Sequence, residues 1–522
     1  MSGDTMKILF AMIGYMVIVI CIGVYFAKRA QANSENYFLG GRSLGPWVAA
    51  MSAEASDMSG WLLMGLPGVA YWCGIADAAW TAIGLAVGTY INWLIVAKRL
   101  RRYSAVSGDA ITVPDFLSNR FHEKKKVILG ISALFILVFF TVYASSCFVT
   151  CGKLFSTLFG VSYHTMMIAG VIFVVVYTFI GGFLAESASD FMQAVVMVIA
   201  LLTILVLGTT AAGGLGAVIQ NSKEIPGFLT LVGIATPQVD AAGVQQAVNG
   251  VPQFGEAGKY GFLTIISTLS WGLGYFGVPQ VLLRFMAIRK EEELKKSRRI
   301  ATVWCLISLF AAVSIGVIGR ALFPVDATLA TASGAENVFV VLSQHLLPPL
   351  LAGVIMAGIL AATISSSDSY LLIAASAFSK NIYEGILKRG KADDKKVMNV
   401  SRGILLLIAL IGVVIAWDEN SIIFTLVSFA WAGFGATFGP VMLFSLFWKR
   451  INRTGAIAGM LAGGISVFVW KQFLKPLGGM WGIYELFPAF VISCVVIIVV
   501  SLATKAPEEA IVKEFESVAA KR

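Results

Sequence analysis

Long apolar stretches alternate with short polar segments along almost the whole chain of 522 residues. A helix needs about 20 mostly apolar residues to cross a bilayer, and about thirteen stretches approach or exceed that length. They lie at roughly 7–27, 48–72, 77–97, 127–151, 165–182, 190–213, 258–284, 301–322, 347–378, 402–417, 421–447, 455–474 and 484–504. The pattern predicts an all-α integral membrane protein of about thirteen transmembrane helices, forming one domain over 1–522 with a short tail at 505–522.

The composition supports a membrane protein. The chain is 58% hydrophobic and 13% charged, whereas soluble domains are typically about 45–50% apolar and about 25% charged. The formal charge of +10 would suggest a nucleic-acid partner in a soluble protein. Here the basic residues fall in short loops between apolar stretches, so the lipid bilayer is the expected partner and nucleic acid is not.

Clusters of basic residues occur in alternate loops. They lie at 28–42, 98–102, 124–126, 289–299, 388–396 and 449–453. Cytoplasmic loops carry an excess of Lys and Arg. The alternation therefore predicts a multi-pass protein of the cell membrane, with its N-terminus outside, its C-terminus in the cytoplasm and the long loop at about 214–257 outside.

Two of the predicted spans contain residues that interrupt helices. The second reads Ala53-Glu54-Ala55-Ser56-Asp57-Met58-Ser59-Gly60-Trp61, followed by a Gly-Leu-Pro-Gly sequence at 65–68, and the seventh runs from Ser270 through several glycines to Pro279. Interrupted spans at matching positions of two halves mark the substrate site of many transporters. Close helix packing through small residues is the alternative, and it explains the second span less well because two acids lie there.

Acidic and hydroxyl side chains within the apolar stretches indicate a cation site. An Asp at the centre of a membrane helix costs about 2.5–3.5 kcal/mol on insertion scales, so Asp57 should face protein or a cavity. Asp190 and Asp368 also lie at or within apolar stretches. The ninth span contains four serines beside Asp368, at 365–369. One or two hydroxyls could bond back to their own helix. The full set suits a small cation such as Na⁺, with carbonyls of the broken span as further ligands, although these residues do not identify the ion.

The sequence lacks the residue clusters of enzymes. Six cysteines lie almost entirely in apolar stretches and three histidines are scattered, which disfavours disulfides, zinc sites and catalysis. Neither a repeated pore loop nor a signalling domain after the last span is evident. These observations favour a transporter over a membrane enzyme, a channel or a sensor, and ion-independent facilitated transport stays open.

Several motifs carry a resemblance to a known family. The stretches are Tyr37-Phe38-Leu39-Gly40-Gly41-Arg42-Ser43-Leu44, residues 56–67 from Ser56-Asp57-Met58 to Leu66-Pro67, Gly181-Gly182-Phe183-Leu184-Ala185 and Trp271-Gly272-Leu273-Gly274-Tyr275-Phe276-Gly277. With these motifs, and over nearly its full length, the chain resembles the solute:sodium symporter family and its sodium/proline branch. The resemblance implies a LeuT-like core in which spans 2–6 (about 48–213) and 7–11 (about 258–447) form inverted five-helix repeats.

The resemblance also implies a set of site residues. A sodium ion would be held by the backbone carbonyls of Ala55, Met58 and Ala362 and the hydroxyls of Ser365 and Ser366, with Asp57 in a supporting role. Substrate would lie near Ser59, Gly60, Trp61, Tyr143, Trp271, Tyr275 and Pro279. A second cation would lie at Asp190, Ser365, Asp368 and Ser369, for which a hydrated structural cluster is the alternative.

The implied activity is secondary active transport, in which inward movement of sodium drives uptake of a small solute, most simply L-proline, by alternating access. Another amino acid or a small carboxylate is the alternative solute, and an ion-independent facilitator or channel is the alternative class. Two residues depart from the family pattern. Glu54 stands where a small residue is expected and Val278 where a polar one is expected, which weakens the assignment of proline more than that of sodium.

Overall fold

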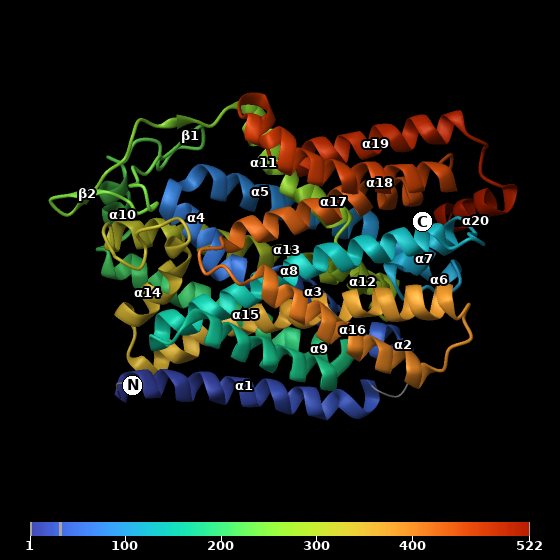
Figure 1. The fold of residues 1–522 in the computed structure, drawn as a ribbon, viewed down its shortest axis with the longest axis horizontal. Coiled ribbons are helices and arrows are strands. Elements are labelled where there is room, and N and C mark those ends of the chain that lie inside the picture. The colour runs from blue at the N-terminus through green and yellow to red at the C-terminus, as the bar shows by residue number, and fades with distance from the viewer. Residues whose placement is uncertain (1–2, 31–33, 521–522) are drawn as a thin grey trace.

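The long helices run roughly parallel to one another along the long axis of the molecule (Figure 1). The computed structural model describes residues 3–30 and 34–520. Its helices are α1 (Gly3–Ala30), α2 (Ser34–Leu39), α3 (Pro46–Asp57), α4 (Leu66–Cys73), α5 (Ile75–Ile91), α6 (Ala97–Val106), α7 (Val113–Arg120), α8 (Val127–Phe159), α9 (Tyr163–Ala211), α10 (Leu215–Ser222), α11 (Phe262–Leu269), α12 (Pro279–Ala287), α13 (Leu294–Leu322), α14 (Val338–Leu346), α15 (Pro349–Ser376), α16 (Asp394–Ile415), α17 (Ile423–Phe447), α18 (Arg453–Val469), α19 (Leu486–Ala503) and α20 (Glu509–Ala520). Short irregular helical turns used below are η2 (Trp61–Gly65), η3 (Asn92–Val96) and η4 (Ser270–Phe276).

Ten helices in the described part of the chain are long and apolar enough to cross a membrane, and eleven if the bent pair Phe262–Phe276 and Pro279–Ala287 counts as one span. Two shorter apolar helices, Trp61–Cys73 and Tyr163–Phe179, lie at the second and fifth predicted spans. The predicted all-α membrane class is therefore confirmed. The predicted count of about thirteen includes these two shorter segments, which do not meet the same length criterion.

One predicted boundary differs from the structure. The fifth and sixth predicted spans are present as two helices within α9, Tyr163–Phe179 and Gly182–Ala211, but the second begins at Gly182 rather than near residue 190. The bend between them is at Gly182, whose φ of 61° and ψ of 179° depart from helical values. Glycine adopts positive φ at little steric cost, so one residue suffices to redirect the helix.

Both predicted helix breaks are present. In the second span α3 ends at Asp57, Met58 leaves the helical conformation, and the helix resumes through η2 into α4. In the seventh span α11 passes into the tight turns of η4, and α12 begins at Pro279 after a bend of 41°. Proline has no N–H for the preceding turn and is favoured at the first positions of a helix, so its position sets the start of α12.

The broken seventh span packs against α5 through glycines. A Cβ added to Gly88 would lie 2.4 Å from the Cα of Gly272, and one added to Gly272 would lie 2.2 Å from the carbonyl oxygen of Gly84. Side chains larger than hydrogen would therefore push the two backbones apart. Small residues allow this kind of close approach between helices in membranes.

Loops that carry the basic clusters meet at one end of the molecule, where α6, α7 and α20 lie (Figure 1). Arg42 binds the carbonyl of Met286 at 2.7 Å, and Arg102 pairs with Glu291 at 2.5 Å. The tail expected at 505–522 contains α20, whose Phe515 lies under the guanidinium of Arg99. The grouping of these loops agrees with the alternation of charge in the sequence.

The opposite end contains α10 and four short strands (Figure 1). Antiparallel pairs join β1 (Gly233–Ile234) to β4 (Gly258–Lys259) and β2 (Ala247–Val248) to β3 (Val251–Pro252). The long loop expected there is thus folded.

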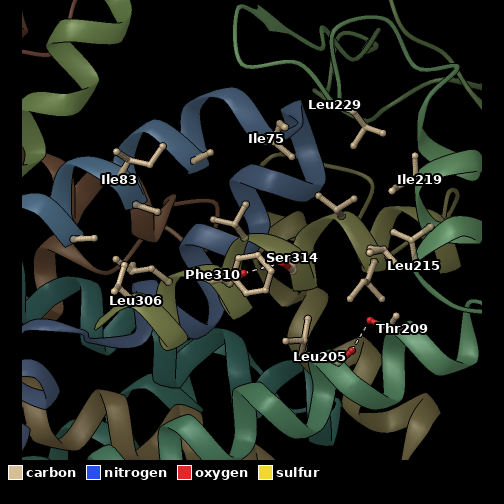
Figure 2. A pocket seen from close by; sticks show the side chains of 18 residues that line it. Ile75, Ile83, Leu205, Thr209, Leu215, Ile219, Leu229, Leu306, Phe310 and Ser314 are labelled. Atoms are coloured by element: carbon tan, nitrogen blue, oxygen red, sulfur yellow. Dashed lines mark hydrogen bonds between the residues drawn. The ribbon is translucent and has the colours of Figure 1, made fainter. Parts of the chain in front are cut away.

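An apolar cavity of about 640 Å³ lies between α5, α9, α10 and α13 (Figure 2). Its two hydroxyl-bearing residues, Thr209 and Ser314, donate to the carbonyls of Leu205 and Phe310 on their own helices. None of the residues predicted to bind sodium or substrate lines this cavity. The polar site is therefore sought elsewhere, at the helix breaks.

Candidate functional site

Most of the predicted sodium ligands come together between α3 and α15. The hydroxyls of Ser365 and Ser366 donate to the carbonyl oxygen of Ala55 at 2.9 and 3.2 Å, and Ser365 also lies 3.1 Å from the carbonyl of Ala362. All four residues are fully buried. Met58 follows the end of α3, where its N–H donates to the carbonyl of Glu54, and no contact of its own carbonyl with this group is described. The arrangement concentrates oxygen atoms beside the break in the second span.

Asp57 connects both broken spans to α8. One carboxylate oxygen accepts a hydrogen bond of 2.7 Å from the Tyr275 hydroxyl. The Asp57 carbonyl accepts bonds of 3.3 Å from Trp61 Nε1 and from the Tyr143 hydroxyl. Three predicted substrate residues are therefore joined through the residue predicted to support the sodium site.

The predicted aromatic residues form one wall. Trp61 stacks on Trp271 with ring centroids 6.0 Å apart. Trp431 of α17 supports the seventh span, because it donates to the Trp271 carbonyl at 2.8 Å and packs edge-on to Tyr275. Sequence reasoning missed Trp431. It is a single aromatic residue in an ordinary apolar stretch, and nothing local distinguishes it from a packing residue.

The other predicted substrate residues are placed differently. Ser59 is buried at the break and its hydroxyl has no hydrogen-bond partner. Gly60 packs on α8, where an added Cβ would lie 2.4 Å from the hydroxyl oxygen of Thr150. Pro279 lines a separate cavity of about 10 Å³ together with Thr112 and Asn381. Ser59 and Gly60 thus directly precede Trp61 of the aromatic wall in the sequence. Pro279 instead lies at the start of α12, next to the separate cavity.

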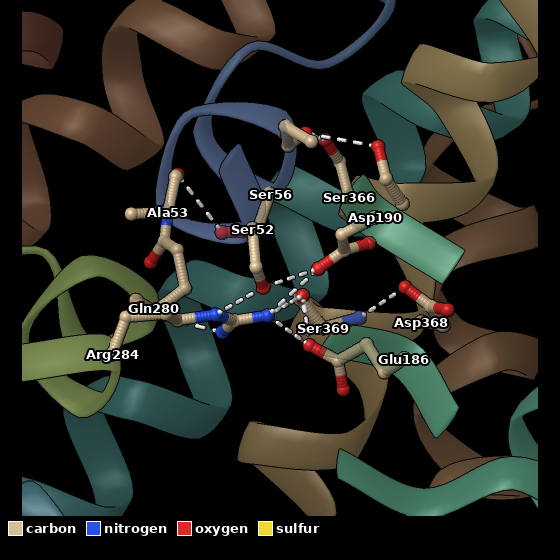
Figure 3. Close-up of polar contacts among 12 residues, drawn as sticks. Ser52, Ala53, Ser56, Glu186, Asp190, Gln280, Arg284, Ser366, Asp368 and Ser369 are labelled. Carbon is tan, nitrogen blue, oxygen red and sulfur yellow. Dashed lines mark hydrogen bonds and ion pairs between the residues drawn. The ribbon is translucent and has the colours of Figure 1, made fainter. Parts of the chain in front are cut away.

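The predicted second-cation residues divide into two groups. Asp190 accepts bonds from Ser52 at 2.6 Å and from Arg284 at 3.2 Å, and Arg284 also donates to Ser369 at 3.0 Å (Figure 3). Asp368 accepts the Ser369 N–H at 2.8 Å. Ser365, by contrast, belongs to the group around Ala55. The expected site is therefore occupied in part by a guanidinium that the sequence analysis did not include.

Glu186 completes the group around Arg284. It forms an ion pair with Arg284 and accepts a hydrogen bond from Ser369 (Figure 3). Arg284 is wholly buried, and its guanidinium also lies 4.9 Å from the ring centre of Phe183. Two carboxyl groups, those of Glu186 and Asp190, thus contact one arginine, and a third, that of Asp368, binds the N–H of Ser369 beside them. The available signal was an arginine inside an apolar stretch, which resembles an ordinary residue at a cytoplasmic helix end.

Comparison with known proteins identifies the family. The profile of the "Sodium:solute symporter family" matches residues 37–463. The chain is 41% identical over 498 residues to sodium/proline symporters of Staphylococcus aureus strains USA300 and JH9, covering 94% of this chain and 92% of each relative.

Solved structures show the same fold. One is the substrate-bound, outward-open state of a Na⁺-coupled sialic acid symporter, which has a TM-score of 0.76 and 17% identity and covers 96% of this chain and 99% of that one. Another is a nucleobase-cation-symport-1 family transporter in a closed conformation, with a TM-score of 0.53, 13% identity and coverage of 93% and 99%. The third, MhsT with L-phenylalanine, has a TM-score of 0.52, 12% identity and coverage of 87% and 98%.

These structural neighbours are LeuT-fold transporters, which confirms the expected fold class. The family match excludes an enzyme and confirms the expected transport activity. The chain belongs to the sodium:solute symporter family and is a multi-pass, Na⁺-coupled symporter with a LeuT-like fold.

Proposed function

We propose that this symporter couples inward movement of Na⁺ to uptake of L-proline. The observation that carries the proposal is the buried group of oxygens from Ala55, Ser365 and Ser366, next to an aromatic wall built on both helix breaks. Support for proline comes from the sodium/proline symporters that are 41% identical over 94% of the chain. Another amino acid or a small carboxylate is the alternative solute.

The sodium ion would bind among the carbonyls of Ala55, Met58 and Ala362 and the hydroxyls of Ser365 and Ser366. Each hydroxyl has one hydrogen and two lone pairs and can rotate. The two serines now point their hydrogens at carbonyl oxygens, and rotation would turn lone pairs toward an ion. Asp57 would support the site by its negative charge.

The solute would lie beside this ion, near Ser59, Gly60, Trp61, Tyr143, Trp271, Tyr275 and Pro279. The stacked indoles of Trp61 and Trp271 offer flat apolar faces to a pyrrolidine ring. Backbone N–H groups at a helix start favour anions, so the resumed helix after Gly60 would face the carboxylate. Ser59 contributes a buried hydroxyl without a partner.

Coupling follows from the elements that the ion joins. Sodium between α3 and α15 would stabilise the arrangement that binds solute, and by linkage each ligand raises the affinity for the other. The halves that move would be the inverted repeats at about 48–213 and 258–447. In the cell membrane the N-terminus would face outward and the C-terminus the cytoplasm, as the basic loops indicate.

The group of Asp190, Ser365, Asp368 and Ser369 is a candidate for a second cation. Three buried carboxyl groups exceed the single charge of Arg284, and one oxygen each of Glu186, Asp190 and Asp368 has no hydrogen-bond partner. Asp368→Asn should then weaken the dependence of uptake on Na⁺. A purely structural cluster would leave that dependence unchanged.

Radiolabelled L-proline uptake into proteoliposomes tests the proposal, with inward gradients of Na⁺ or of K⁺. Uptake above equilibrium with Na⁺ alone is expected, and unlabelled proline should compete better than other amino acids or small carboxylates. Sodium-dependent uptake of a different competitor would replace the solute and keep the mechanism. Equal uptake with Na⁺ and K⁺ would overturn the coupling.

A further inference from the structure

Two acidic side chains on α3 lie in the protein interior without a basic partner. Glu54 and Asp57 are three residues apart, so they share one side of the helix. Their exposed fractions are 1% and 0%. Neither takes part in any ion pair that the structure describes for residues 3–30 and 34–520. The nearby guanidinium of Arg284 is engaged by Glu186 and Asp190 instead.

A closed ring of contacts joins these acids across four elements. Thr89 of α5 donates to Glu54 at 3.2 Å. Asn92, one turn later in η3, donates through Nδ2 to the Tyr275 carbonyl at 2.9 Å. The Tyr275 hydroxyl returns to Asp57 at 2.7 Å. The ring therefore runs from α3 through α5 and η3 to η4 and back.

Each side-chain carboxyl or amide group in the ring has one oxygen without a partner. These atoms are Glu54 Oε2, Asp57 Oδ1 and Asn92 Oδ1, and Asn92 is wholly buried. The indole N–H of Trp93 also lies close to Glu54 without reaching hydrogen-bond geometry, and it carries no charge. Buried polar atoms are normally satisfied and buried charges normally paired. Two unpaired carboxyl groups and one amide oxygen without a hydrogen-bond donor are suited to bind a small cation.

This ring is separate from the group around Ala55. The backbone carbonyl of Ala55 faces the serines of α15, whereas the side chain of Glu54 faces Thr89 of α5. Glu54 is also one of the two residues expected to depart from the family pattern. Its acidic group supplies a ligand that a small residue at this position would not.

We propose that a further sodium ion binds between α3 and η3, beside η4, held by the carboxylates of Glu54 and Asp57 and the side-chain oxygen of Asn92. The inference rests on the proposed sodium coupling and adds an ion to it. Oxygen ligands and two negative charges suit Na⁺ in a water-poor site. Because its ligands come from α3 and η3, this ion joins the second span to η3, whose Asn92 also binds the Tyr275 carbonyl of η4. The ion at Ser365 and Ser366 joins α3 to α15 instead.

The test counts sodium ions. Equilibrium binding of ²²Na⁺ to purified protein is measured for the wild type, Glu54→Gln, Glu54→Asp, Asp368→Asn and Ser366→Ala. The ratio of ²²Na⁺ to proline taken up is measured for the same proteins in proteoliposomes. Glu54→Gln should bind one sodium ion fewer per protein and carry one fewer per proline, while uptake still requires Na⁺. Glu54→Asp keeps the charge and should keep the count at a weaker affinity. Its binding also shows that a variant at this position folds.

Two results would overturn the inference. One is an unchanged sodium count and ratio in Glu54→Gln. The other is a lost ion in Asp368→Asn alone, which would place the additional ion beside Arg284. The proposed function fails differently: the wild type would then bind no Na⁺ or take up proline equally in its absence. A loss in Ser366→Ala without any change in Glu54→Gln would keep the coupling and remove only the additional ion.

Discussion

Ser365, Ser366 and Ser367 are consecutive on α15, yet their hydroxyls have different partners. Ser365 and Ser366 reach across to Ala55 on α3. Ser367 donates to Thr363 on its own helix at 2.6 Å, which is the usual way a hydroxyl is satisfied in an apolar helix. Only the first two therefore connect α15 to the break in the second span.

This difference gives a matched pair of variants. Ser366→Ala removes a proposed sodium ligand and should raise the Na⁺ concentration for half-maximal proline uptake at least about tenfold, equivalent to about 1.4 kcal/mol. Ser367→Ala should change it little, because its partner lies on the same helix. The sodium dependence of initial uptake rates measures both. Equal effects would show that the hydroxyl run acts only by packing.

Residue chemistry was partly predictable from sequence. The serines and Asp57 were recognisable because a polar group inside an apolar stretch is costly. Glu186 and Arg284 were not recognised as a pair, since 98 positions separate them and each resembles an ordinary helix residue in its own segment. Tertiary pairing of this kind leaves no local pattern.

At the scale of elements, four side chains that bind Arg284 by hydrogen bonds or ion pairs bring three helices to α12. Ser52 lies on α3, Glu186 and Asp190 on α9, and Ser369 on α15. Breaking a buried ion pair leaves uncompensated charge in a water-poor environment. The contact between α12 and these helices should therefore depend strongly on this one guanidinium.

Arg284→Gln should destabilise the folded protein by about 3–5 kcal/mol. The apparent melting temperature of purified protein in detergent reports the loss, and adding Glu186→Gln should recover part of it by removing one unpaired acid. Arg289→Gln is the matched control, because that exposed arginine pairs with Glu293 one turn away, and we expect no measurable shift. Similar shifts in both single variants would contradict the role of the buried group.

The glycine contact between α5 and η4 makes a second prediction at this scale. Gly272→Ala would place a Cβ 2.2 Å from the Gly84 carbonyl oxygen and should destabilise the protein by about 1–3 kcal/mol through overpacking. Gly403→Ala on α16 has no atom within 4 Å of its added Cβ and should be neutral or slightly stabilising. The melting temperatures of the two variants test this prediction. A melting temperature of Gly272→Ala equal to that of the wild type would contradict close packing between η4 and α5.

The two helix breaks were predictable from the sequence, but the residue at which the sixth span begins was not. Glycine and proline act on their immediate neighbours, so the interruptions after Asp57 and before Pro279 were visible in the sequence. At Gly182 a single glycine bends α9 without a polar loop. The apolar pattern placed the start of the sixth span near residue 190, because acidic and hydroxyl residues precede it, whereas in the structure the helix already begins at Gly182 and includes those residues.

At the scale of the whole molecule, the alternation of basic loops predicts the direction of insertion. Loops at opposite ends of the bundle should differ in access to a membrane-impermeant thiol reagent (Figure 1). In a cysteine-free background, Asn221→Cys on the exposed side of α10 should react in intact cells. Lys391→Cys, between η7 (Ala377–Leu387) and α16, should react only after permeabilisation. The reverse pattern would invert the proposed topology.

The central claim is that a sodium gradient drives accumulation of solute through this fold. The most direct measurement is the steady-state ratio of internal to external L-proline in proteoliposomes as the imposed Na⁺ gradient is varied without a membrane potential. The account predicts that the ratio exceeds one, rises with the gradient and collapses when a sodium ionophore is added. A ratio that stays at one for every gradient, with proline still equilibrating, would contradict it.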